Sequence, residues 1–258
     1  MGTVVEYPTP RSRASGGGGP LSAQWTDASR VALVGPGDLP VRVGIDTYTW
    51  AELQTAYPNN GAALLALAAN TMVFVSEPTW RALMVRSPDG AYWVSVHGSI
   101  ALHVDPVAVA GHTGTLTKTI QKSILIPGGL ATPNSMLRIH TKHSRLQGSG
   151  AALASSQGSM EISLNTSAAL GGTVLGWTRF SSTNRAGEWD TIVQLRNARN
   201  SQISSVDIET PGATQVAGAF RTAAIDMAND AYVVIAFELT DTGHIHTLQS
   251  TTIELICR

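Results

Sequence analysis

The chain has 258 residues and a formal net charge of −1, and only 14% of its residues are charged. A near-neutral chain lacks the basic field that recruits nucleic acid or anionic lipid, so neither is expected as a partner. The single cysteine, Cys257, excludes a disulfide within the chain, and no apolar run is long enough for membrane insertion. A weakly charged surface suits either a protein whose faces are covered by other subunits or an ordinary soluble β-protein.

The start of the chain, residues 1–29, shows no hydrophobic periodicity. Pro8, Pro10 and the glycine-rich run 16–20 indicate an extended N-terminal arm. Such an arm is either a disordered tail or a segment that orders only against a partner, with Tyr7 among its few apolar anchors. It has no apolar core of the signal-peptide kind, so we expect synthesis in a cytosol and release by lysis or as part of a particle.

Residues 30–105 are predicted to form a small α+β module. Thr47 or Thr49 can cap a short helix that contains Trp50, and Pro58 ends this helix. A second short helix is expected within the Ala/Leu-rich segment that follows. The expected strands are 41–45, 72–75, 82–86 and 91–96, and the last two form a hairpin around the turn Ser87-Pro88-Asp89-Gly90.

Residues 115–258 are predicted to form an antiparallel β-sandwich of the jelly-roll type, joined to the module by a linker at 106–114. Nine runs with strand character are separated by turn signals at the spacing of such a domain. They are 116–126, 136–142, 160–165, 173–180, 191–197, 203–209, 220–226, 232–239 and 247–256. The last two runs are interpreted as a hairpin around the turn 240–243, whose final strand completes a sheet.

The sequence carries none of the motifs that organise common catalytic sites. There is no Gly-x-Ser-x-Gly nucleophile motif, no phosphate-binding loop and no dinucleotide fingerprint. We therefore expect no enzymatic activity and no cofactor.

Glu188 and Asp190 flank Trp189 just before a predicted strand. An aromatic ring beside acidic groups is common in sugar-binding sites, so these three residues are a candidate carbohydrate-binding patch. The same residues also fit an ordinary turn that leads into the strand 191–197.

His244 and His246 are separated by one residue beside the turn 240–243. On a strand, alternate side chains share a face, so both imidazoles can approach one centre. Two ligands are too few within one chain, but three copies around a three-fold axis would supply six nitrogens for an octahedral metal site. The alternative is two half-exposed histidines at a hairpin.

Two groups of residues carry a resemblance to a known family. In the module, the helix sequence Thr-Tyr-Thr-Trp-Ala-Glu-Leu at 47–53 precedes the hairpin sequence Asp-Gly-Ala-Tyr-Trp at 89–93. The β-domain contains Ile-Leu-Ile-Pro at 124–127 and Met-Leu-Arg-Ile at 136–139, and it closes on Thr-Ile-Glu-Leu at 252–255. This layout is similar to the fibre, spike and other appendage proteins of tailed bacteriophages that end in a jelly-roll domain.

The resemblance implies a structural virion protein, a tail fibre, head fibre or spike that forms a homotrimer. Its N-terminal part would dock on tail or capsid proteins, and its C-terminal β-domain would serve host attachment and receptor binding, with a surface glycan as a common receptor of such proteins. Two alternatives stay open: a capsid decoration or connector protein without receptor binding, and a free carbohydrate-binding module.

Overall fold

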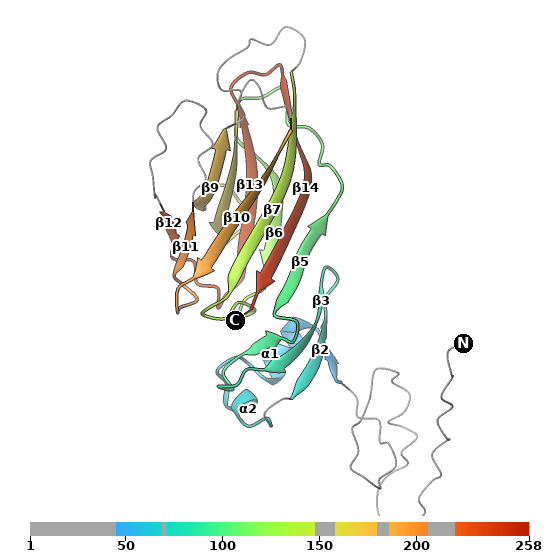
Figure 1. Cartoon of the computed structure of the whole chain (residues 1–258), viewed down its shortest axis with the longest axis vertical. Helices are drawn as coiled ribbons and strands as arrows, with labels where there is room; N and C mark the ends of the chain where they lie inside the picture. The colour runs from blue at the N-terminus through green and yellow to red at the C-terminus, as the bar shows by residue number, and fades with distance from the viewer. Residues whose placement is uncertain (1–44, 69–70, 148–157, 180–185, 206–219, 258) are drawn as a thin grey trace, which may run out of the picture.

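The computed structural model describes residues 45–68, 71–147, 158–179, 186–205 and 220–257 (Figure 1). These residues form a small N-terminal α+β module and a larger antiparallel β-sandwich, so the chain is mainly β, as predicted. The expected arm at 1–29 and most of the expected strand 41–45 lie outside the described residues. Within the described ranges, no helix is long and apolar enough to cross a membrane.

The module begins with strand β1 (Thr47–Tyr48) and the two predicted helices, α1 (Trp50–Ala56) and α2 (Ala62–Leu65). Thr49 caps α1, because its hydroxyl accepts from the backbone N–H of Glu52 while the Glu52 carboxylate accepts from the backbone N–H of Thr49. This reciprocal capping box defines the first residue of the helix.

Strands β2 (Met72–Ser76), β3 (Arg81–Arg86) and β4 (Trp93–Ser95) complete a four-stranded sheet in the order β1-β2-β3-β4. The predicted hairpin joins β3 to β4. Its turn is fixed by the carboxylate of Asp89, which accepts from the Ser87 hydroxyl and from the backbone N–H of Ala91. Gly90 follows with a φ of 75°, a conformation that favours glycine.

The sandwich consists of a six-stranded and a four-stranded sheet. The larger sheet, in the order β12-β11-β10-β7-β14-β5, contains β5 (Ser99–Asp105), β7 (Met136–Gln147), β10 (Ala186–Leu195), β11 (Gln202–Ser205), β12 (Phe220–Ala223) and β14 (His244–Ile256). The smaller sheet, in the order β6-β13-β8-β9, contains β6 (Thr119–Ile126), β8 (Gly158–Asn165), β9 (Thr173–Arg179) and β13 (Ala231–Leu239). All nine strands predicted for this domain are present.

The order of strands in the two sheets is that of a jelly roll. β5, β7, β10 and β14 belong to the larger sheet, whereas β6, β8, β9 and β13 form the smaller one. β11 and β12 extend the larger sheet at one edge. The predicted fold class is therefore confirmed.

One strand of the sandwich comes from the segment that was assigned to the module. The boundary expected at residue 105 is wrong, because Ser99–Asp105 forms β5 and pairs with β14 in the larger sheet. The module therefore ends near Gly98. The expected linker 106–114 is a connection inside the sandwich, where His112 forms an antiparallel bridge with His246.

The last two strands do not form the expected hairpin. β13 pairs with β6 and β8, whereas β14 pairs with β5 and β7, so the turn 240–243 carries the chain from one sheet to the other. Alternation of apolar residues shows which face of a strand is buried but does not identify the neighbouring strand. Both connections fit the sequence equally well.

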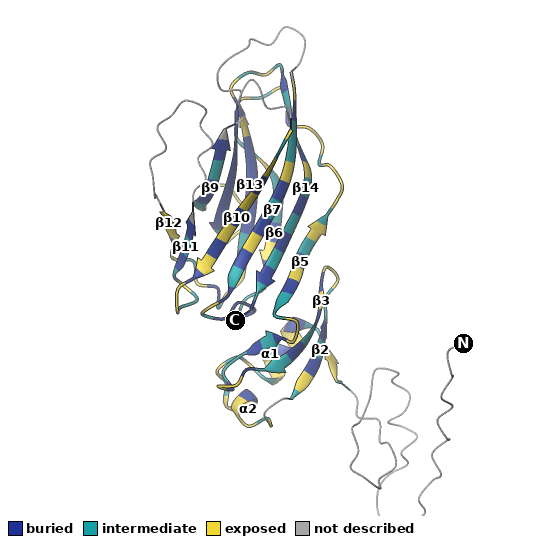
Figure 2. Ribbon diagram, viewed as in Figure 1, coloured by how far each residue is buried: buried dark blue, intermediate teal, exposed yellow. Residues whose placement is uncertain are grey.

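Alternate residues of each strand fill the space between the sheets (Figure 2). On β14, Thr251, Ile253 and Leu255 are buried, while Thr252 and Glu254 between them are only partly covered. This alternation divides every strand of the larger sheet into an inner, packed face and an outer face open to solvent.

The module is attached to one end of the sandwich by hydrogen bonds and by a shared core. Trp50 Nε1 donates to the carbonyl of Gly128 at 2.9 Å, and Asn59 Nδ2 donates to the carbonyl of Gly129 at 2.6 Å. The buried side chains of both parts belong to one continuous hydrophobic cluster. We call this end of the sandwich proximal, and the opposite end, with the turn 240–243, distal (Figure 1).

Candidate functional site

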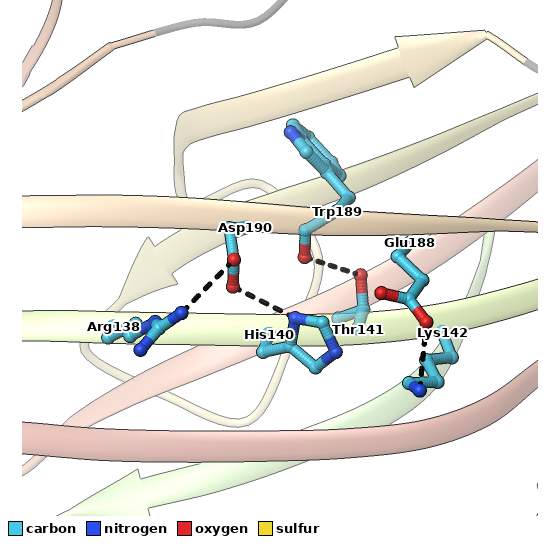
Figure 3. A network of polar contacts seen from close by, with 7 residues as sticks. All are labelled: Arg138, His140, Thr141, Lys142, Glu188, Trp189 and Asp190. Carbon is cyan, nitrogen blue, oxygen red and sulfur yellow. Dashed lines mark hydrogen bonds and ion pairs between the residues drawn. The ribbon is translucent and has the colours of Figure 1, made fainter.

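Charged side chains gather on the outer face of the larger sheet, where β7 and β10 lie side by side (Figure 3). Arg138, His140 and Lys142 point outward from β7, because they alternate with residues that face the core. Glu188 and Asp190 point outward from β10 in the same way. We call these five residues the outer-face cluster.

The antiparallel register places opposite charges across from each other, His140 beside Asp190 and Lys142 beside Glu188. His140 Nδ1 donates to Asp190 Oδ1 at 2.9 Å, and an Arg138 guanidinium nitrogen donates to Asp190 Oδ2 at 3.3 Å. Lys142 Nζ lies 2.8 Å from Glu188 Oε1. Exposed ion pairs add little to stability, so their main effect here is to hold the side chains in a fixed pattern.

Both carboxylates of the outer-face cluster are ionised at neutral pH. Burial raises the pKa of Asp190, but the hydrogen bonds from His140 and Arg138 outweigh this effect and leave the pKa below its usual value. The hydrogen bond from Lys142 lowers the pKa of Glu188. The face therefore presents hydrogen-bond donors and ionised acceptors side by side.

A hollow of about 270 Å³ opens beside these ion pairs and is lined by Arg138, His140, Thr252 and Glu254. Arg138 offers only donors, Glu254 offers acceptors when ionised, and the Thr252 hydroxyl can do both. This mixture suits the binding of one hydroxylated or charged group of a larger surface.

Trp189 does not belong to the outer-face cluster. Its indole is only 8% exposed, and it leaves β10 on the side opposite to the other labelled side chains (Figure 3). There it lies so close to Gly176 that a Cβ at that position would meet the ring at 2.7 Å. The candidate patch is thus divided: Glu188 and Asp190 are exposed, and the ring of Trp189 is not available for stacking on a sugar.

His244 and His246 share one face of β14, but it is the inner face. Both side chains are fully buried at the distal end, with ring centroids 6.5 Å apart. A metal site across a three-fold axis would need both imidazoles at the surface, so this fold does not provide that site. Among the described residues, no group of three or more His, Cys, Asp or Glu side chains could hold a metal ion.

The distal interior contains further basic side chains. His143 and Arg145 face inward from β7, and both lie close enough to His246 to affect its protonation, as do His112 and His244. Burial, with repulsion from these neighbours, lowers the pKa of His246 to about 3. Burial also lowers the pKa of His143 to about 4. Both imidazoles are therefore neutral at neutral pH.

The β7 half of the site was not predicted from the sequence. Arg138, His140 and Lys142 alternate with Leu137 and Ile139, a period-two pattern that marks an exposed strand face. The signal was present, but it does not indicate which acidic strand lies opposite.

No protein-family model matches the sequence, and no curated protein matches it. Among solved structures, the CBM2 module of the evolved Dit of Lactobacillus casei BL23 phage J-1 is similar over 51% of this chain and 67% of that one, with 12% identity and a TM-score of 0.27. Arcelin-5, a lectin-like defence protein of Phaseolus vulgaris, is similar over 64% of this chain and 90% of that one, with 11% identity and a TM-score of 0.28. For lectin II from Ulex europaeus the shares are 63% and 89%, with 10% identity and a TM-score of 0.28. Likenesses this distant carry no argument about function.

Proposed function

We propose that the protein is a structural virion protein of a tailed bacteriophage. In this proposal it is a fibre- or spike-type appendage that docks to the particle through its N-terminal part and contacts the host surface through its β-domain. The observation that carries the proposal is the polarity of the molecule: the module stands at one end, and the turn 240–243 stands at the other (Figure 1). An appendage needs one end for attachment and a separate surface for contact.

The outer-face cluster is the proposed host contact. Its donors and ionised acceptors are flanked on the same face by the exposed apolar side chains of Val104 and Ile192. Hydrogen-bonding groups beside small apolar patches suit a surface polysaccharide, which offers hydroxyls and C–H groups together. Glu188 and Asp190 keep a role in carbohydrate binding in this proposal, whereas Trp189 has none.

A homotrimer is part of the same proposal. Within one chain, β5 and β12 are open edges of the larger sheet, and edge strands tend to pair or to be covered. The exposed ring of Phe220 on β12 supports such covering. Size-exclusion chromatography with light scattering should give three times the chain mass of 27.1 kDa, and a clean monomer at micromolar concentration would contradict the trimer.

Host contact is tested by the binding of labelled full-length protein to a panel of bacterial strains. The full chain is required, because a fragment that starts at Thr115 lacks strand β5. The double variant His140→Ala/Asp190→Ala should bind susceptible cells about tenfold more weakly, as expected from the loss of two or more hydrogen bonds. Glu238→Ala, which removes an exposed acid from the smaller sheet, is the matched control and should bind as the wild type does.

Two other results would redirect the proposal. Protein that binds purified phage particles but no cell would be a decoration or connector protein. Release of reducing ends from a bound polysaccharide would reveal catalysis, whereas our proposal is binding without cleavage.

A further inference from the structure

A cleft of about 780 Å³ opens at the proximal end, between the module and the sandwich. The module contributes Asn60, Asp89 and Tyr92 to its lining, and the sandwich contributes Asn134 and Asn197. This volume falls within the range of about 300–1,000 Å³ that is usual for small-molecule sites, and such sites often lie between domains. None of these residues belongs to the outer-face cluster.

Two of the lining asparagines have an unusual backbone conformation. Asn60 has a φ of 59° and Asn197 a φ of 58°, and in the described part of the chain no other residue except glycine has a positive φ. Asparagine adopts this conformation more readily than most residues. The backbone N–H of Asn60 also donates to the carbonyl of Ala91 at 2.7 Å, which ties it to the turn of the β3–β4 hairpin. Such conformations gather at binding sites, where they hold side chains in place.

The polar groups of the cleft match the hydrogen-bonding chemistry of hydroxyls. An asparagine amide both donates and accepts, as a sugar hydroxyl does. Asp89 accepts from Ser87 and Ala91 through Oδ1 alone, so Oδ2 remains for a ligand hydroxyl. The hydrogen bond from Ser87 lowers the pKa of Asp89, which keeps this carboxylate ionised.

Tyr92 adds an aromatic surface to the cleft. Its hydroxyl accepts from Asn60 Nδ2 at 3.3 Å, and the guanidinium of Arg199 lies 5.7 Å from the ring centroid. These two contacts orient the ring, which can then pack against the C–H face of a pyranose. Among the described lining residues only Asp89 is charged, so the cleft disfavours phosphates and uronic acids.

We propose that this cleft binds a neutral saccharide of one or two rings. The three asparagines and Asp89 hydrogen-bond its hydroxyls, and Tyr92 packs against one ring. The inference does not depend on a virion function, because it rests only on groups at the junction of module and sandwich.

Saturation-transfer difference NMR of the full chain tests the inference with glucose, galactose, N-acetylglucosamine, cellobiose and lactose, and with glucuronic acid and glucose 6-phosphate as anionic probes. The test variant is Asn134→Ala/Asn197→Gly. Glycine at 197 tolerates the positive φ, and both replaced side chains are exposed, so the melting temperature should stay unchanged. Glu238→Ala on the smaller sheet is again the control.

We expect at least one neutral sugar to receive saturation from the wild type, and its affinity to fall about tenfold in the double variant but not in the control. Saturation of no neutral sugar would overturn the inference, as would unchanged affinity in the double variant or a preference for the anionic probes. Loss of sugar binding in His140→Ala/Asp190→Ala alone would place the sugar on the outer face and would also overturn it. Failure here with intact cell binding leaves the proposed host contact standing.

Discussion

The proximal and distal halves of the sandwich interior are built from the same strands but from different kinds of residue. On β7, the inward positions are Leu137 and Ile139 in the proximal half, and His143 and Arg145 in the distal half. β14 makes the same change, with a fully buried His246 in its distal part. The difference teaches that burial alone does not define a hydrophobic core. We expect the proximal half to supply most of the stability and the distal half to open first.

Acidification should break the distal half with the largest effect. In the unfolded chain, His143 and His246 take up protons as the pH falls through about 6.5. In the folded chain they stay neutral down to about 4 and about 3, respectively. The unfolded state binds more protons in this window, so stability is full above pH 7 and falls by on the order of 5 kcal/mol between pH 7 and pH 4. Urea unfolding at several pH values measures this loss.

His246→Leu is the matched variant for the pH experiment. It removes one buried imidazole from among His112, His143, His244 and Arg145, so the loss of stability on acidification should become smaller. His140→Ala removes a histidine from the outer face and should leave the loss nearly unchanged. Equal pH dependence in wild type and His246→Leu would contradict the assignment to the distal interior.

In the proximal half, truncation of an apolar side chain should be the most damaging single change. Leu137 is fully buried, so Leu137→Ala should lower the free energy of unfolding by about 3 kcal/mol through lost burial and a residual cavity. Chemical denaturation at pH 7 gives the value. A loss below about 1 kcal/mol would show that the proximal core is not tightly packed.

The junction with the module should extend the stable half. Trp50→Phe keeps an aromatic ring but removes the hydrogen bond to the Gly128 carbonyl, which should cost about 1–2 kcal/mol. If the module unfolds with the proximal core, tryptophan fluorescence and far-ultraviolet circular dichroism should report one shared transition. Two separate transitions would show that the module is an independent unit.

The outer face should be the least sensitive region. Arg138→Ala removes one exposed partner of Asp190 and should change the free energy of unfolding by no more than about 1 kcal/mol. Thermal melts of this variant and of Leu137→Ala compare neighbouring residues on opposite faces of β7. Similar shifts would contradict the division of this strand into a packed and an open face.

Strand positions were predictable because alternating sequence patterns are local, whereas pairing partners were not. All nine runs assigned to the β-domain form strands, yet β5 was assigned to the module because it follows the hairpin that ends there. The jelly-roll prediction and the hairpin prediction were also incompatible, since this topology places β13 and β14 in different sheets. Local pattern gave the elements, and only the global topology decides their neighbours.

The candidate site shows the same limit. The one-residue spacing predicted that His244 and His246 share a face, which is correct, but polar residues gave no sign that this face is the inner one. The spacing rule also separates Trp189 from Glu188 and Asp190, so the division of that patch was predictable. The proximal cleft was not, because its lining residues are far apart in the sequence.

The attachment of β5 has a mechanical consequence. β5 starts next to the module at the proximal end and runs along β14 toward the distal end. A pull that draws the module away from an anchored distal end acts along the strand axis, while the backbone hydrogen bonds of this ladder lie across it. Tension therefore loads these bonds together in shear instead of opening them one after another, and β5 serves as a tether whose strength grows with the length of the ladder.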